Sequence, residues 1–238
     1  MKYKDISADW PKYNHRAGYP KTRREVEIDM LVIHCTADDD MVGEDVYRII
    51  NYATHPNHVC STGCWTIFYH YYIEAVTGET TIWKTAPHDI QTFHAGLWNK
   101  RSLGIVVDKK EQTVVTEDKY KALVELLVNL CITYKLNPYV AIVGHRNLYW
   151  TGWEIVNGIF KQKKTCPGVL PIITLQDDVV KGLEDEGYIC PTLVVTPYMK
   201  NLEPYVTLEY YDHVNSANFL VEKENANNLR KGICLWKT

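Results

Sequence analysis

The chain has 238 residues and a formal net charge of −3, and 46% of its residues are hydrophobic while 23% are charged. This length and composition predict either one large globular domain or a domain of about 150–180 residues with a small appendage. The near-neutral balance excludes electrostatic attraction to nucleic acid or to an anionic membrane as the main mode of binding.

The sequence carries no signs of export or of membrane insertion. Its N-terminus has no apolar stretch of signal-peptide type, and no window approaches membrane-spanning length. Seven scattered cysteines without a dense framework predict a chain that folds in a reducing cytosol without a membrane anchor. Cys60 and Cys64 lie near His55 and His58, but their order and the lack of a matching second half make a structural zinc there a weak alternative.

The first half of the chain predicts strands around one helix. About 25 polar residues form an extended lead-in, and the apolar run 26–35 then predicts a central strand buried on both faces. Apolar positions in 43–54 are spaced for one helix face. Residues 65–75 and 77–84 predict a hairpin, and 102–108 predict another short buried strand.

The second half continues the alternation. Residues 116–138 predict a helix with an N-terminal threonine, acidic residues in its first turn and a proline at its end. The run 139–145 predicts a strand that ends on a histidine, 146–165 a long loop, and 173–187 another helix. Strands that alternate with helices indicate an α/β fold with a mixed central β-sheet flanked by helices.

The sequence pattern changes from about Tyr188 onward, where short predicted strands separated by prolines precede an Asn-rich segment. We therefore predict a first domain over residues 1–186, with its core at about 27–180, and a small C-terminal β-rich extension over 187–238. The extension is either a small second domain or a segment that packs on the first.

Two histidines at the ends of predicted buried strands, His34 and His145, are the main chemical signal. Ligands of open α/β sheets gather outside the strand ends, and a catalytic zinc takes three protein ligands of the imidazole, thiolate or carboxylate type. Cys35 follows His34 on the strand and should point to the opposite face. Cys166 follows the second strand on a loop that can fold back over the strand ends. A strand-end histidine is more often structural, so spacing alone leaves both readings open.

Five motifs occur in order along the chain, namely VIHCTA, YHYYI, FHAG followed by NKRSLGIVV, VGH and KKTCPG. This series resembles the type 2, zinc-dependent N-acetylmuramoyl-L-alanine amidases, the family of small phage lysozyme-amidases and peptidoglycan recognition proteins. The resemblance spans about residues 27–180, and its specificity lies in the order of the motifs. It implies one Zn²⁺ per chain, held by His34, His145 and Cys166.

The resemblance also implies roles for residues around the metal. Tyr69 corresponds to the family's catalytic tyrosine, Lys164 to the lysine that faces the substrate carbonyl, and His94 to a histidine that lines the substrate groove. Judged without the resemblance, these residues are a strand tyrosine, a solvated loop lysine and a histidine in a structural hydrogen bond. Trp150 and Trp153 lie in an insertion longer than is usual in the family, and they form either a wall for substrate or a small local core.

The implied reaction is hydrolysis of the amide bond between N-acetylmuramic acid and L-alanine in bacterial peptidoglycan. Zinc lowers the pKa of bound water from about 15.7 towards about 7 and polarises the carbonyl, and a nearby lysine adds roughly 3 kcal/mol of stabilisation to an oxyanion in well-placed cases. Two alternatives are a peptidoglycan recognition module without catalysis and a Cys–His hydrolase that uses Cys35 or Cys166.

The missing signal peptide and the C-terminal extension together favour a phage endolysin. Such an enzyme accumulates in the host cytoplasm and acts on the cell wall after lysis. The extension over 187–238 would then be a small cell-wall-binding domain.

Overall fold

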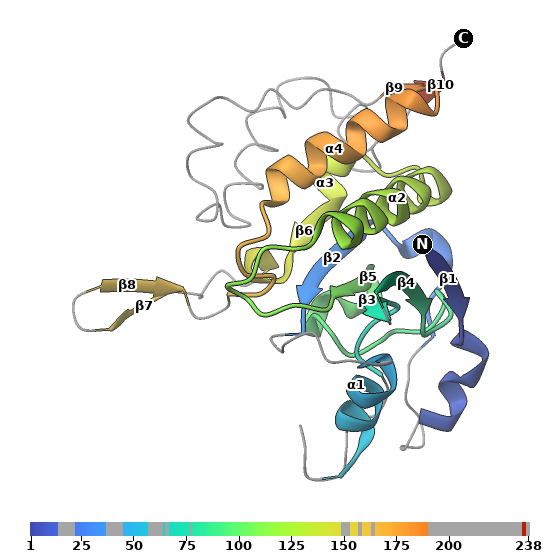
Figure 1. The fold of residues 1–238 in the computed structure, drawn as a ribbon. Coiled ribbons are helices and arrows are strands. Elements are labelled where there is room, and N and C mark those ends of the chain that lie inside the picture. Colours follow the sequence, from blue (N-terminus) through green and yellow to red (C-terminus); the bar gives the residue numbers. More distant parts are fainter. Residues whose placement is uncertain are drawn as a thin grey trace.

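The fold is built around a six-stranded mixed sheet with helices on both faces (Figure 1). The computed structural model describes residues 1–13, 22–36, 45–56, 64, 67–76, 78–148, 153–156, 159–162, 165–189 and 235–236. The order of the strands is β1-β4-β3-β5-β2-β6. The predicted α/β class is confirmed, and the first predicted strand lies inside the sheet, between two partners.

Four strands of the sheet run in the same direction. These are β2, β3, β5 and β6, because β2 pairs in parallel with both β5 and β6, and β3 pairs in parallel with β5. The antiparallel β3–β4 hairpin reverses the direction, and β1 adds to β4 at the edge. The bounds are β1 Lys2–Asp5, β2 Met30–Cys35, β3 Tyr71–Val76, β4 Glu79–Lys84, β5 Ser102–Val107 and β6 Ile142–Gly144. The carboxyl ends of β2, β3, β5 and β6 therefore meet at one edge of the sheet.

Helices of different parts of the chain cover the two faces. One face is covered by α2 (Glu117–Tyr134), α3 (Pro138–Ala141) and α4 (Ile172–Asp185), and the other is covered in part by α1 (Asp45–Thr54) (Figure 1). Val46 and Ile50 of α1 pack against Tyr72, Trp83 and Val106 of the sheet. The helix face predicted for the segment around α1 is thus the face that meets the strands.

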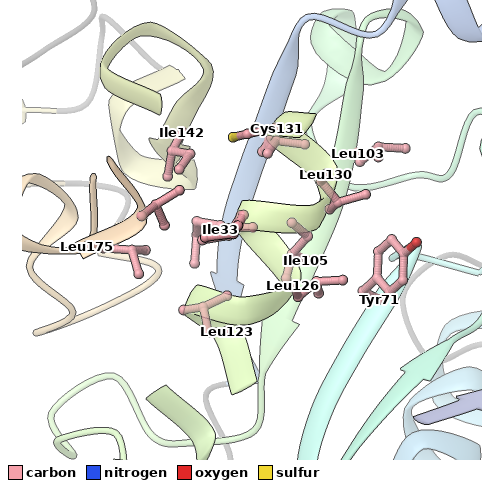
Figure 2. Packing of buried hydrophobic residues seen from close by; sticks show 14 of the residues in the cluster. Ile33, Tyr71, Leu103, Ile105, Leu123, Leu126, Leu130, Cys131, Ile142 and Leu175 are labelled. Atoms are coloured by element: carbon pink, nitrogen blue, oxygen red, sulfur yellow. The ribbon is translucent and has the colours of Figure 1, made fainter. Parts of the chain in front are cut away.

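The main core lies between the sheet and the α2–α4 layer, where the labelled side chains of α2 and α4 face those of the strands (Figure 2). Ile33 of β2 and Ile105 of β5 are fully buried there, against Leu123 and Leu126 of α2 and Leu175 of α4. Complete burial of such a side chain contributes roughly 1.5–3 kcal/mol. Because successive side chains of a strand point to opposite faces, burial of Ile33 in this core turns the next residue, His34, towards the other face.

The structure corrects the extended N-terminal lead-in and the start of the first hairpin strand. Residues 2–5 form β1, and a 3-10 helix follows over Ser7–Tyr13. Strand β3 begins at Tyr71 and not at residue 65. The backbone hydrogen bonds of His70 lie outside the paired residues of β3. Its N–H donates to Gly104 O, and its carbonyl accepts from Thr85 N. Tyr69 and His70 therefore precede the strand.

Two predicted segments near His145 also differ. The run 139–145 is divided between α3 and β6, because the Asn137 side chain accepts a hydrogen bond from Tyr139 N and Pro138 opens a helical turn. The predicted loop 146–165 contains an antiparallel hairpin of β7 (Trp153–Val156) and β8 (Ile159–Gln162).

The C-terminal part is described only at its two ends. Strand β9 (Tyr188–Ile189) pairs antiparallel with β10 (Leu235–Trp236), and Tyr188 is buried in the main core cluster. The division between residues 186 and 187 stays a prediction. Among the described residues, no helix combines the length and the hydropathy that a membrane crossing needs.

A buried carboxylate joins α1 to the sheet. Glu74 of β3 is 1% exposed, and its oxygens accept hydrogen bonds from Trp83 Nε1 at 2.7 Å and from Val46 N at 3.2 Å. Val46 lies in the first turn of α1, where backbone N–H groups lack partners within the helix. Burial raises the pKa of Glu74 from 4.5 to about 7, although the hydrogen bond from Trp83 and a backbone hydrogen bond from Asp45 oppose the shift.

This shift predicts how stability depends on pH. Between pH 4.5 and about 7 the folded chain retains a proton on Glu74 that the unfolded chain has lost, so the free energy of unfolding falls as pH rises through this interval. Replacing Glu74 by Gln removes the titration, and urea unfolding at several pH values should give a flatter profile, with a difference on the order of 3 kcal/mol across the interval. Parallel profiles for the two proteins would contradict the prediction.

Candidate metal centre

The three predicted ligands come together at the carboxyl edge of the sheet. His34 lies near the end of β2, His145 directly follows β6, and Cys166 lies on the loop before α4. One ligand atom from each lies within 4.8 Å of the other two. Because β2 and β6 are hydrogen-bonded neighbours in parallel, the two histidines reach the same place although 111 positions separate them in the sequence (145 − 34).

The chemistry of these residues fits a zinc ion. Two imidazoles and a thiolate form a ligand set of the catalytic type. His34 Nδ1 lies 3.8 Å from Cys166 Sγ, and a tetrahedral zinc with ordinary bond lengths needs roughly 3.6 Å between such a nitrogen and sulfur. His34 is buried, whereas His145 and Cys166 are half-buried. The cluster is therefore closed on the side of β2 and more open on the side of the two loops.

The loop that carries Cys166 is tied to the residue after His145. The backbone N–H of Arg146 donates to Cys166 O at 2.8 Å, and the Arg146 guanidinium donates to Gly168 O and to Leu170 O. Lys109 also binds the loop that carries Cys166, since its Nζ donates to Pro167 O at 3.2 Å. These bonds hold the second and third candidate ligands in a fixed relation.

Gly168 allows the close packing of this loop. It adopts a φ of +71°, and a Cβ at this position would lie 1.9 Å from the backbone oxygen of Glu111. Val169 N donates to the same oxygen at 2.8 Å. The glycine of the CPG motif is thus required both by the left-handed backbone and by the approach of another segment.

Cys35 lies at the edge of the centre. It is buried, as predicted, but it is not turned away from the centre as its place after His34 predicted, because its backbone N–H donates to Cys166 Sγ at 3.2 Å and its thiol interacts with the Cys166 thiol. A hydrogen bond with the Cys35 side chain, together with burial, raises the pKa of the Cys166 thiol above its ordinary value. A metal ligand must be deprotonated, so a bound cation is the group that would favour the thiolate here.

The Tyr69 ring lies beside the candidate ligands. Its centroid is 4.9 Å from that of His34, whose ring is in turn 4.4 Å from that of His145. Burial, and then the nearby Cys166, raises the pKa of Tyr69 above its ordinary value. The phenol therefore stays protonated at neutral pH and can donate a hydrogen bond near the metal centre.

His94 lies behind His34. It is 8% exposed, and its Nδ1 is 3.1 Å from His34 Nε2 while its Nε2 is 3.2 Å from Ser102 Oγ. Burial, followed by the positive charges that His145 and Arg23 can carry, lowers the pKa of His94 to about 3.

The other predicted site residues are not placed by the structure. Lys164, Trp150, Cys60 and His58 lie outside the described residues. Trp153 begins β7, where the description is limited to the backbone.

Arg23 is a supporting residue that the sequence did not indicate. Its buried guanidinium donates to Asn99 O at 2.7 Å, to Ser102 O at 2.6 Å and to His88 O at 2.8 Å. It therefore fixes the start of β5, which carries the partner of His94. An arginine in the polar stretch KTRRE has no local signal of burial, because the carbonyls that bind it are distant in sequence.

Comparison with known proteins identifies the family. The family model described as N-acetylmuramoyl-L-alanine amidase matches residues 23–169, which is more than half of the chain and includes all three candidate ligands. No curated protein matches the chain.

Solved structures share the fold at low sequence identity. The N-acetylmuramoyl-L-alanine amidase LysC from Clostridium intestinale has a TM-score of 0.52 at 20% identity, over 75% of this chain and 97% of that chain. An endolysin amidase named LysCS, from the same organism, has the same TM-score and identity, over 75% of this chain and 95% of that chain. Bumblebee PGRP-SA has a TM-score of 0.52 at 15% identity, over 71% and 89%.

The packing of Gly168 predicts a measurable cost for an added methyl group. Gly168→Ala should lower the free energy of unfolding by roughly 3–5 kcal/mol, because it combines left-handed strain with a backbone clash. Gly78→Ala is the matched control, since Gly78 has a φ of +83° but nothing within 4 Å of its Cβ position; it should lose only about 1–2 kcal/mol. Equal losses in urea unfolding would show that the contact with Glu111 is not rigid.

Proposed function

Because the chain belongs to the N-acetylmuramoyl-L-alanine amidase family, we propose that it hydrolyses the amide bond between N-acetylmuramic acid and L-alanine with one zinc ion. His34, His145 and Cys166 would hold this ion. The observation that carries the proposal is the meeting of their three ligand atoms within 4.8 Å at the carboxyl edge of the sheet. Three protein ligands of this kind are the number that a catalytic zinc uses.

The reaction needs a nucleophile and a stabilising charge at the carbonyl oxygen. Zinc, when bound, supplies an activated water and polarises the carbonyl. Tyr69, whose ring lies 4.9 Å from that of His34, would donate a hydrogen bond from its phenol either to the attacking water or to the oxygen that gains charge. Lys164 would add a positive charge at the same oxygen. Its assignment depends on its place two residues before Cys166.

The substrate is bacterial peptidoglycan, in keeping with the family. The resemblance assigns His94 to the substrate groove, but we do not propose that role, because both its ring nitrogens have partners within the protein. Trp150 and Trp153, which lie in a loop longer than is usual in the family, are proposed to form a wall that contacts the substrate. We further propose that the chain acts as a phage endolysin, produced in the host cytoplasm and active on the cell wall after lysis. The family membership and the likeness to an amidase that is described as an endolysin support this role. Residues 187–238 would then aid binding to the wall.

The function is tested by measuring zinc content and cleavage on the same samples. The wild type should contain about one zinc per chain and release new L-alanine amino termini from purified peptidoglycan. Cys166→Ser should lose most of the zinc and at least about 100-fold in rate, because it removes one of three ligands. Cys131→Ala removes a thiol from the core, away from the site, and should keep both properties.

Further variants separate metal binding from catalysis. Tyr69→Phe should retain zinc and lose rate. Treatment with a chelator should abolish activity, and added zinc should restore it. Zinc without cleavage would favour a recognition module, whereas cleavage that survives the chelator would favour a thiol hydrolase and refute the zinc proposal.

A further inference from the structure

The position of His94 suggests a role other than contact with substrate. Its ring lies beneath His34, with one nitrogen towards His34 and the other towards Ser102. Both ring nitrogens are thus engaged within the protein, and the side chain is 8% exposed. A residue that lines an open groove would keep at least one nitrogen available to a ligand.

The hydrogen-bond partners determine where the protons lie. The Ser102 hydroxyl has a single proton, which it donates to Trp98 O at 2.7 Å. Its oxygen therefore accepts from His94 Nε2–H. A neutral imidazole carries a single ring proton, and this geometry places it on Nε2 of His94, towards Ser102. Its Nδ1 is then a lone-pair acceptor.

This assignment extends to the candidate ligand. If His94 Nδ1 accepts, His34 must carry its proton on Nε2 and donate across the 3.1 Å contact. The lone pair of His34 is then on Nδ1, the atom that lies 3.8 Å from Cys166 Sγ. We propose that His94 is a positioning residue that selects the Nε2–H tautomer of His34 and directs Nδ1 towards the other two ligands. The inference rests on the proposed zinc site and extends it.

The surrounding residues hold His94 in this orientation. Asn99 Oδ1 accepts from the backbone N–H groups of His94 and Ala95, at 3.2 and 2.6 Å. Gly104 of β5 leaves space for the ring, because a Cβ there would lie 2.7 Å from His94 Cγ. The asparagine, serine and glycine of the motif NKRSLG thus all act on the same histidine. Metal-binding histidines commonly donate their second nitrogen to a neighbouring acceptor, which fixes the tautomer.

The test measures zinc affinity by competition with a chromophoric chelator. His94→Phe keeps the ring but removes the acceptor, and should raise the zinc dissociation constant about 10- to 100-fold. His94→Asn places an oxygen where Nδ1 lies and should recover most of that loss, which a purely space-filling role would not predict. His88→Phe, which removes a partly buried histidine bonded to Tyr71, should bind zinc as the wild type does.

A direct readout on the wild type keeps the inference testable even if His94→Phe does not fold. Two-bond ¹H–¹⁵N correlation spectra of the zinc-loaded protein should show the proton of His34 on Nε2 and a metal-bound Nδ1. A proton on Nδ1, or a His94→Phe variant that binds zinc as tightly as the wild type, would overturn the role of His94 while leaving the zinc site intact. A wild type that binds no zinc would instead refute the proposed function, and the inference with it.

Discussion

The parallel pairing of β2 with its two neighbours is the constraint on which the candidate metal centre depends. Parallel strands end at the same edge of a sheet, so the register of Leu31 with Ile142 and of His34 with Val106 determines where the side chains at that edge lie. The strand alternation then decides which residue faces the core. Ile33 fills the space under α2 and α4, and His34 is thereby directed to the other face. A slip of one residue would exchange the two and remove the ligand.

Contacts outside the sheet fix the position of the third candidate ligand, which the strands alone do not determine. The third ligand lies on a loop, and loops hold a fixed geometry only where other groups bind their backbone. Arg146 and Lys109 bind the carbonyls of this loop, and Gly168 permits its contact with residue 111. On the opposite side of the centre, Arg23 and Asn99 fix the segment beneath His34. Several buried donors therefore hold the groups that a metal would meet, in keeping with the need for rigid ligands at a catalytic metal.

Much of the sheet was predictable because its strands are short, apolar and bounded by turn residues. The strands at His34 and at Ser102 and the long helix α2 follow directly from the sequence. The local pattern failed where distant backbone groups decide the conformation. The polar residues 2–5 form a strand because β4 offers an edge, and Tyr69 lies outside β3 because His70 is bonded to Gly104 and Thr85. The hairpin β7–β8 was missed although the sequence signals it, because the dipeptide Asn157-Gly158, typical of two-residue hairpin turns, separates two apolar pairs at 155–156 and 159–160.

The site was predictable as a set of residues but not as an arrangement. The motifs indicated His34, His145 and Cys166, and the structure brings them together. No property of the sequence reveals that His94 faces inward, since a histidine in a glycine-containing turn reads equally well as exposed. Burial of Arg23 was hidden for the same reason, because its partners are carbonyls at residues 88, 99 and 102.

The central claim is that the ends of two parallel strands and one loop form a single zinc site with one sulfur ligand. X-ray absorption at the zinc edge tests this claim most directly, because it counts the ligand types around the metal. We expect one sulfur at about 2.3 Å and two imidazole nitrogens at about 2.0–2.1 Å, with the remaining scattering from oxygen or nitrogen. A spectrum without sulfur, or with two or more sulfurs, would contradict the assignment of His34, His145 and Cys166 as the ligands.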